Sequence, residues 1–248
     1  MQLKIIIHLD NSLTIPISYH HLLQAIIYKL MGDSNGLSAL HDSGKQFGKR
    51  TYKLFTFSLI EGKYRIQDKK ITFFDIISFE VRSFDDVLIK QIEDNALRHG
   101  IQFGQNNYTK IECICRNEHI TKDSILINMI SPVCIHKTIM HSNYTNYLNP
   151  SNPDFAKEIN NNFIRKYKAA EIEDLPLSSE ENYITISPVR VSQKDKYITI
   201  YKDTIIEAYR GIYVLSGKVE YLDFLYNVGI GSKNSQGFGM FNLFKNTQ

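Results

Sequence analysis

The chain of 248 residues has only three cysteines and no long hydrophobic run. Its apolar stretches fall short of the roughly 18 residues that a membrane-spanning helix needs. The apolar run at the N-terminus is broken by His8 and Asp10, and no small-residue cleavage site follows it, so a secretory signal peptide is not expected. These absences predict a cytoplasmic protein without a membrane partner.

The cysteines and histidines lack the spacing of a metal site. Cys113, Cys115 and Cys134 form an odd set, and the first two alternate onto one face of an expected strand, where buried thiols are the favoured interpretation. A zinc site needs more ligands in wider pairs, and no paired carboxylates resemble those of a two-metal nuclease. We therefore expect neither a metal nor another cofactor.

The composition is that of an ordinary folded protein, with 43% hydrophobic and 22% charged residues. A formal net charge of +3 permits an acidic partner without requiring one. Basic residues gather between Lys45 and Lys53, whereas acidic residues gather at 171–181. This separation predicts one basic face.

The expected elements follow the order βαββαβ in the first half of the chain, and the second half approximates the same order with one additional strand. In the first half the patterns predict strands at 3–9, 52–60, 71–83 and 101–116 and helices at 19–31 and 83–100, the second of them capped by Ser83. In the second half they predict strands at 124–137, 182–192, 197–202, 204–217 and 239–244 and helices at 152–170 and 219–227. This order is typical of the ferredoxin-like unit. We predict an α+β protein of two tandem ferredoxin-like domains, residues 1–120 and residues 121–248.

Glycines are concentrated in one segment, GIGSKNSQGFGMF. Within eleven positions the chain places four of its 13 glycines: Gly229, Gly231, Gly237 and Gly239. A hairpin turn would need fewer, and the spacing fits neither a Walker loop nor a dinucleotide fingerprint. Glycine lets another molecule approach main-chain N–H groups closely, so this cluster, with Ser232 and Lys233, suits contacts to phosphate.

Two segments resemble one known family. They are YKLM leading to LHDSGKQFGKRTYKLFTFS, and the loop Gly-x-Gly, five residues, Gly-x-Gly. Together they are similar to the CRISPR-associated endoribonucleases of the sixth Cas protein family, in the repeat-associated RNA-binding superfamily, which cut precursor CRISPR RNA within its repeats. The segment SPVCIHK at 131–137 is also similar to a family strand. The resemblance implies two ferredoxin-like domains and a glycine-rich loop near the end of the chain.

The resemblance also implies an active site with a histidine after the first helix, often with a tyrosine on that helix and a nearby lysine. His41 matches the histidine and Tyr28 the tyrosine, while Lys45 or Lys49 matches the lysine. We take Lys45 as the catalytic candidate. RNA-binding candidates are Lys49, Arg50, Gly229, Gly231, Ser232, Lys233, Gly237 and Gly239.

Each catalytic assignment has a structural alternative. His41 could instead end a helix, and Tyr28 could pack at the margin of the core. His20 and His21 form a reserve acid and base pair, although successive helical residues point apart and one of the two should face solvent.

The leading hypothesis is a metal-independent endoribonuclease that cleaves CRISPR repeat RNA into guide RNAs. Attack by the 2′-hydroxyl would leave a 2′,3′-cyclic phosphate and a 5′-hydroxyl, with histidine, tyrosine and lysine supplying proton transfer and positive charge. The alternative is a non-catalytic RNA-binding subunit of a CRISPR effector complex; a third is an unrelated protein that binds a small acidic ligand. Effector-complex subunits and a second copy of the chain stay open as further partners.

Overall fold

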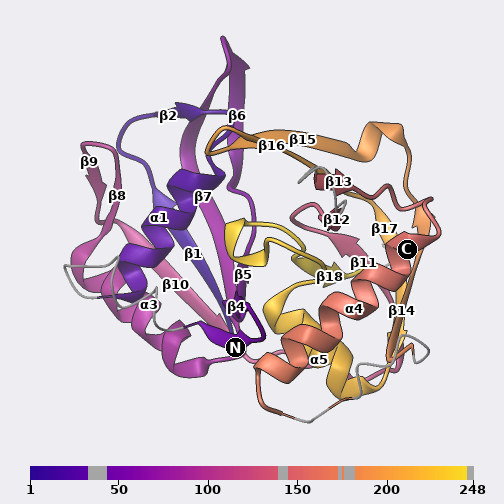
Figure 1. Cartoon of the computed structure of the whole chain (residues 1–248). Helices are drawn as coiled ribbons and strands as arrows, with labels where there is room; N and C mark the ends of the chain where they lie inside the picture. The colour runs from indigo at the N-terminus through magenta and orange to yellow at the C-terminus, as the bar shows by residue number, and fades with distance from the viewer. Residues whose placement is uncertain (33–43, 139–144, 173–174, 176–181, 245–248) are drawn as a thin grey trace.

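The computed structural model describes residues 1–32, 44–138, 145–172, 175 and 182–244 (Figure 1). Two antiparallel sheets of different size lie side by side, each with its own helices. The strands of the first sheet come from residues 2–83 and 111–116, and those of the second from residues 124–243. The predicted fold class of two tandem ferredoxin-like units is confirmed by the strand orders below.

The first sheet has the order β10-β1-β7, and three more strands pair with the long strand β7. Its members are β1 (Gln2–His8), β2 (Leu13–Pro16), β5 (Phe55–Phe57), β6 (Glu61–Gln67), β7 (Lys70–Ser83) and β10 (Ile111–Arg116). In β1 the alternation of Leu3, Ile5 and Ile7 puts three fully buried side chains on one face. That face is covered by α1 (His20–Met31) and α3 (Asp86–His99), which lie against each other (Figure 1).

The second sheet has the order β14-β17-β11-β18. Its elements are β11 (Ser124–Met129), α4 (Asp154–Ala169), β14 (Ile184–Arg190), β17 (Ile212–Gly217), α5 (Val219–Val228) and β18 (Phe241–Leu243). Numbered along their own unit, both sheets have the ferredoxin-like order in which the first and third strands are central. Gly229, with φ +83°, ends α5 as the sequence predicts.

Short hairpins and turns connect these elements. They are β3 (Lys45–Phe47) with β4 (Arg50–Tyr52), β8 (Ile101–Phe103) with β9 (Asn106–Tyr108), β12 (His136–Thr138) with β13 (Thr145–Tyr147), and β15 (Lys196–Tyr201) with β16 (Thr204–Tyr209). Single 3-10 turns are η1 (Gln193–Asp195) and η2 (Asn234–Gln236). Strands β15 and β16 form a separate ribbon rather than joining the second sheet.

Several sequence predictions need correction. The N-cap of α3 is Asp85, which accepts the N–H groups of Val87 and Leu88; Ser83 instead accepts the N–H of Asp85. The expected strand 124–137 is broken after Met129. Strands β2 and β6 are absent from the sequence prediction. In β6 only Tyr64 and Ile66 alternate with polar residues, and every residue of the strand is exposed.

The thiol prediction is correct at one position and wrong at another. Cys134 is buried, Cys113 is partly buried, and Cys115 is exposed near Glu93. The two strand cysteines share a face, but Cys115 lies beside the polar side chain of Glu93 on α3 and stays exposed.

A buried arginine joins the two halves. Arg82 of β7 is 1% exposed, and its guanidinium donates to the carbonyl oxygen of Phe241 at 2.7 Å and lies 4.1 Å from the ring centre of Tyr226. Glu80 supplies the counter-charge at 2.5 Å. The first sheet provides the arginine, whereas the carbonyl comes from β18 and the ring from α5 of the second unit, so this contact fixes the two units against each other. Among the helices that the structure describes, none has the length and apolar character needed to cross a bilayer.

Candidate active site between the two sheets

The glycine-rich loop, residues 229–239, lies between the two sheets, where Figure 1 draws it in yellow. Gly237 has φ +86°, and a Cβ there would lie 2.5 Å from the Phe57 ring and 2.9 Å from His20 Nδ1. At Gly231, a Cβ would lie 2.5 Å from the carbonyl oxygen of Cys134. Both positions therefore need glycine so that the loop can pack closely against protein on either side.

A buried lysine holds the loop from within the second unit. Lys166 of α4 donates to the carbonyl oxygens of Gly229 at 2.5 Å and Gly231 at 3.3 Å and to Asn234 Oδ1 at 3.1 Å. Complete burial lowers the pKa of Lys166 to about 7. The Asn234 amide in turn donates to the carbonyl oxygens of Ile230 and Phe238 at 3.0 Å. These bonds fix the path of the loop.

Several main-chain N–H groups of the loop are already bonded inside the protein. Those of Ser232, Gly237 and Gly239 donate to the carbonyl oxygens of Cys134, Asn234 and Pro132 at 2.6, 3.0 and 2.9 Å. The four glycines are buried, whereas Ser232 and Lys233 are partly exposed. Close packing of the loop against both units and against itself thus accounts for the glycines, and RNA contact through the loop stays a prediction.

One face of α1 meets this loop. The Gln24 amide nitrogen donates to the Ser235 carbonyl oxygen at 2.5 Å and to the Tyr28 hydroxyl oxygen at 3.3 Å. Burial raises the pKa of Tyr28, and the hydrogen bonds with Ser235 and Gln24 lower it by a smaller amount. The predicted tyrosine is therefore half-buried, and its hydroxyl lies beside the loop.

The lysine next to Tyr28 is one that the sequence interpretation did not select. Lys53, between β4 and β5, places its ammonium 4.6 Å from the centre of the Tyr28 ring. Burial lowers the pKa of Lys53. A cation and a phenol thus lie together at one edge of the interface.

The predicted lysine and the two predicted RNA-binding cations lie on the β3–β4 hairpin. Lys45 is exposed and pairs with Glu171 at 3.4 Å, and Lys49 and Arg50 are exposed. Burial, together with the charges of Lys233 and Arg50, lowers the pKa of His136 to about 4. The β3–β4 hairpin and the glycine-rich loop thus each place a positive charge close enough to His136 to lower its pKa.

The reserve pair separates as predicted, with His20 fully buried and His21 exposed. The carbonyl oxygen of Gln236 lies 2.8 Å from His20 Nδ1, which therefore donates; Nε2 accepts from the Tyr197 hydroxyl at 3.0 Å. The ring also stacks on Phe238 at 4.7 Å between centroids. Both nitrogens are bonded and the ring is enclosed, so His20 is a contact between the units rather than an exposed acid or base.

We expect His20 to make the fold less stable in mild acid. Burial lowers its pKa from 6.5 to about 4 in the folded protein, so between these values the unfolded chain binds a proton that the folded chain does not. The free energy of unfolding should fall by up to about 3 kcal/mol as the pH drops through this range. Denaturant unfolding at several pH values measures the effect, with His20→Gln as the non-titrating control. An equal fall in both proteins would contradict the prediction.

Two hollows flank α1. One of about 450 Å³ is lined by Lys45, Tyr52 and Lys53 together with Asp85 and Asp86, and it includes the lysine beside Tyr28.

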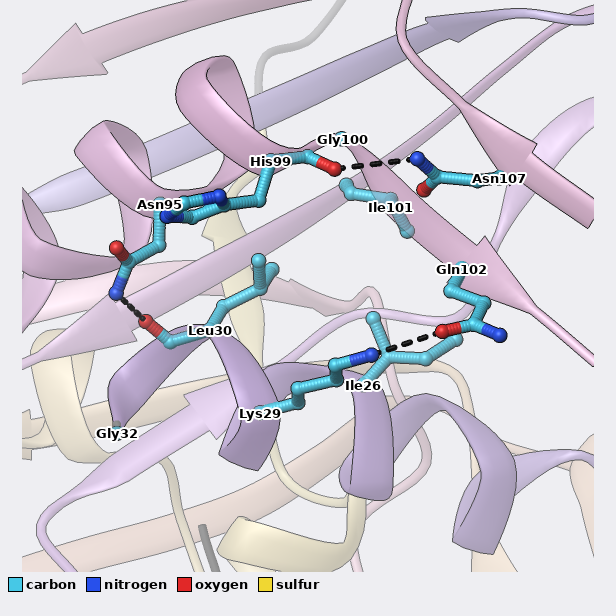
Figure 2. Close-up of a pocket in the computed structure, with 10 residues that line it drawn as sticks. All are labelled: Ile26, Lys29, Leu30, Gly32, Asn95, His99, Gly100, Ile101, Gln102 and Asn107. Atoms are coloured by element: carbon cyan, nitrogen blue, oxygen red, sulfur yellow. Dashed lines mark hydrogen bonds between the residues drawn. The ribbon is translucent and has the colours of Figure 1, made fainter. Parts of the chain in front are cut away.

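The other hollow, of about 760 Å³, lies between α1, α3 and the β8–β9 hairpin (Figure 2). There the polar groups are bonded to neighbours: Lys29 Nζ to Gln102 at 2.8 Å, Asn95 to the Leu30 carbonyl at 2.9 Å and Asn107 to the His99 carbonyl at 3.2 Å. The smaller hollow is therefore the better candidate for a site.

His41, the predicted catalytic histidine, lies outside the described residues. In the described ranges, no three or more His, Cys, Asp or Glu side chains are grouped as metal ligands would be.

The comparison with protein families decides the assignment. A family model described as "CRISPR associated protein Cas6, C-terminal" matches residues 115–243, slightly more than half of the chain. The chain belongs to the Cas6 family. The predicted family is thereby confirmed, and the matched range includes the glycine-rich loop.

Relatives of this Cas6 chain extend the match beyond the C-terminal half. A protein of Methanocaldococcus jannaschii named "CRISPR-associated endoribonuclease Cas6 1" is 26% identical over 255 residues, which cover 97% of this chain and 91% of that protein. A solved structure of a Cas6-related protein from Pyrococcus furiosus has a TM-score of 0.78 at 22% identity, covering 100% of this chain and 99% of that one. Another, described as "An RAMP protein binding different RNA substrates", has a TM-score of 0.78 at 20% identity and covers 99% and 100% of the two chains. These likenesses show that the whole chain has the Cas6 fold.

Sequence reasoning missed two residues of the candidate site, Lys53 and Gln24, which contact Tyr28. Lys53 could have been chosen from its position, two residues before the buried Phe55. A side chain next to a buried strand is held more firmly than one on an exposed hairpin, which suits a catalytic role. Gln24 lies one helical turn before Tyr28, a spacing that puts both on one face of α1.

Proposed function

We propose that the chain is a metal-independent endoribonuclease that cleaves CRISPR repeat RNA. The observation that carries the proposal is the pairing of Tyr28 with Lys53 beside the glycine-rich loop, in a member of the Cas6 family. The name of the Methanocaldococcus jannaschii relative supports the activity, and the description of the RAMP structure supports an RNA partner.

The residues suit cleavage by the RNA's own 2′-hydroxyl. In that reaction the 2′-oxygen bonds to phosphorus while the bond from phosphorus to the 5′-oxygen breaks. The 2′-hydroxyl proton is given up, and the 5′-oxygen takes one up, so the products are a 2′,3′-cyclic phosphate and a 5′-hydroxyl. His41, assigned from the family resemblance, exchanges protons near neutral pH. Lys53 neutralises charge that builds up on the phosphate, and the Tyr28 hydroxyl donates a hydrogen bond to a reacting oxygen.

Charge on the β3–β4 hairpin and the loop suits an RNA backbone. Lys49 and Arg50 are exposed, and Lys233 is partly exposed on the rim of the loop. Phosphate contacts of this kind position RNA without reading its sequence. We propose that these three cations lie along the path of the repeat RNA.

Cleavage of end-labelled repeat RNA in EDTA tests the proposal. The wild-type protein should cut the RNA at one position with the metal chelated, because the proposed reacting groups come from the chain and from the RNA itself. His41→Ala should lose cutting and retain binding in a filter assay. RNA that is bound but left intact by the wild-type protein would instead favour a non-catalytic RNA-binding subunit.

A further inference from the structure

Gln24 of α1 is buried where three parts of the chain meet. Its side chain is 9% exposed, and its neighbours belong to α1 itself, to the glycine-rich loop and to the β15–β16 ribbon. Two of these three parts come from the C-terminal half of the chain, whereas Gln24 and Tyr28 come from the N-terminal half. The residue is thus a polar contact across the interface, adjacent to the proposed catalytic tyrosine.

The hydrogen bonds use both protons of the Gln24 amide and its oxygen. The nitrogen has two protons, one donated to the Ser235 carbonyl oxygen and one to the Tyr28 hydroxyl oxygen. The amide oxygen accepts from the Tyr201 hydroxyl of β15. A flipped amide would bring its oxygen against the Ser235 carbonyl oxygen, so these partners fix one orientation.

This orientation has a chemical consequence for Tyr28. Because Gln24 donates to the phenol oxygen, the phenol's own proton is left to be donated elsewhere. Tyr28 is held at its ring by Phe55 at 5.9 Å and by Lys53 at 4.6 Å. The ring contacts set where the hydroxyl lies, and the Gln24 amide, together with the Ser235 side chain, sets which way its proton points.

We propose that Gln24 is a positioning residue for RNA cleavage, which directs the Tyr28 hydroxyl and ties it to the glycine-rich loop and to Tyr201. The inference rests on the proposed function. It assigns the loop a part in the reaction that is separate from any contact with RNA. The second unit, through Ser235 and Tyr201, sets the geometry of a reacting group on the first.

A double-mutant cycle tests the inference by single-turnover cleavage of repeat RNA. Tyr28→Phe should slow cleavage by about 100-fold, which is the scale of one proton-donating group. Gln24→Leu should slow it by about 10-fold when Tyr28 is present and by less than about twofold in the Tyr28→Phe background. Affinity for an uncleavable 2′-deoxy repeat RNA should be the same in all four proteins, so the losses fall on the rate and not on binding.

A second pair of variants separates positioning from simple loss of packing. Tyr201→Phe removes the hydroxyl that orients Gln24 and should slow cleavage several-fold. Tyr197→Phe removes a hydroxyl from the same strand, which bonds to His20 and not to Gln24, and should leave the rate unchanged. Equal melting temperatures for the two variants should accompany this difference in rate.

The possible failures are distinguishable. Losses from Gln24→Leu and Tyr28→Phe that multiply to about 1,000-fold would overturn the inference, because independent residues combine in this way. Equal rates for Tyr201→Phe and Tyr197→Phe would also overturn it. A wild-type protein that leaves the RNA intact would overturn the proposed function, and this inference with it.

Discussion

Repeat RNA with a single 2′-deoxy nucleotide at the cleavage position should not be cut, although the protein should bind it as tightly as the all-RNA substrate. The expected loss is complete because the nucleophile itself has been removed, whereas a protein variant removes only one of several contributions. The side chains proposed for the site assist a reaction in which the attacking oxygen comes from the substrate.

Denaturing gel analysis of the two RNAs, with binding measured in parallel, checks this result. An RNA with the 2′-deoxy nucleotide one position away is the control and should be cut at the wild-type rate. Cleavage at the modified position would mean that water or a protein group attacks the phosphate, and the roles given to Tyr28 and Lys53 would then have to change.

Lys53→Met should slow cleavage by about 100- to 1,000-fold, the loss typical of removing one group that stabilises transition-state charge. Methionine keeps much of the apolar stem that lies against Tyr28 and removes only the ammonium. Burial lowers the pKa of Lys53, and a cation in such partly dry surroundings interacts more strongly with a phosphate than one in open solvent. Single-turnover rates at saturating protein measure the effect without a contribution from binding.

Two other lysines make the Lys53 result specific. Lys29→Met removes a lysine from α1 whose ammonium bonds to Gln102 in the other hollow (Figure 2), and it should cut at the wild-type rate. A large loss in Lys45→Met with little loss in Lys53→Met would contradict the structural assignment and favour the lysine chosen from the sequence.

The fold could be predicted from the sequence because its core elements have simple periodicities. Buried and partly exposed residues alternate along strand β1, and helix α4 has an apolar stripe. Local patterns of this kind were enough to predict the duplicated order of strands and helices. Strand β6 could not be predicted in this way, because its exposed residues are held by pairing with β7 rather than by burial. The ribbon β15–β16 was predicted as strands, but its departure from the second sheet depends on contacts with α1 and the loop, which no local pattern encodes.

The candidate site was predictable only in part, for a related reason. Tyr28 could be chosen because the family resemblance points to it. The sequence offered several lysines within nine positions and no means to rank them, since the ranking depends on which ammonium reaches the Tyr28 ring. From the sequence, the four glycines were interpreted as exposed backbone that contacts a ligand. The same spacing also suits a loop that packs closely against other parts of the protein.

The position of the glycine-rich loop limits how a protein of this kind can be recombined. Residues of the glycine-rich loop pack against Thr56 and Phe57 and against the face of α1 that carries His20 and Gln24. The Thr56 hydroxyl, for example, donates to the Phe238 carbonyl oxygen at 3.2 Å. A hybrid that takes its first unit from one parent and its second unit from another would combine a loop and a packing surface whose side chains are not complementary. The two halves of the chain, although each has the topology of a separate fold, should therefore be inherited as a pair.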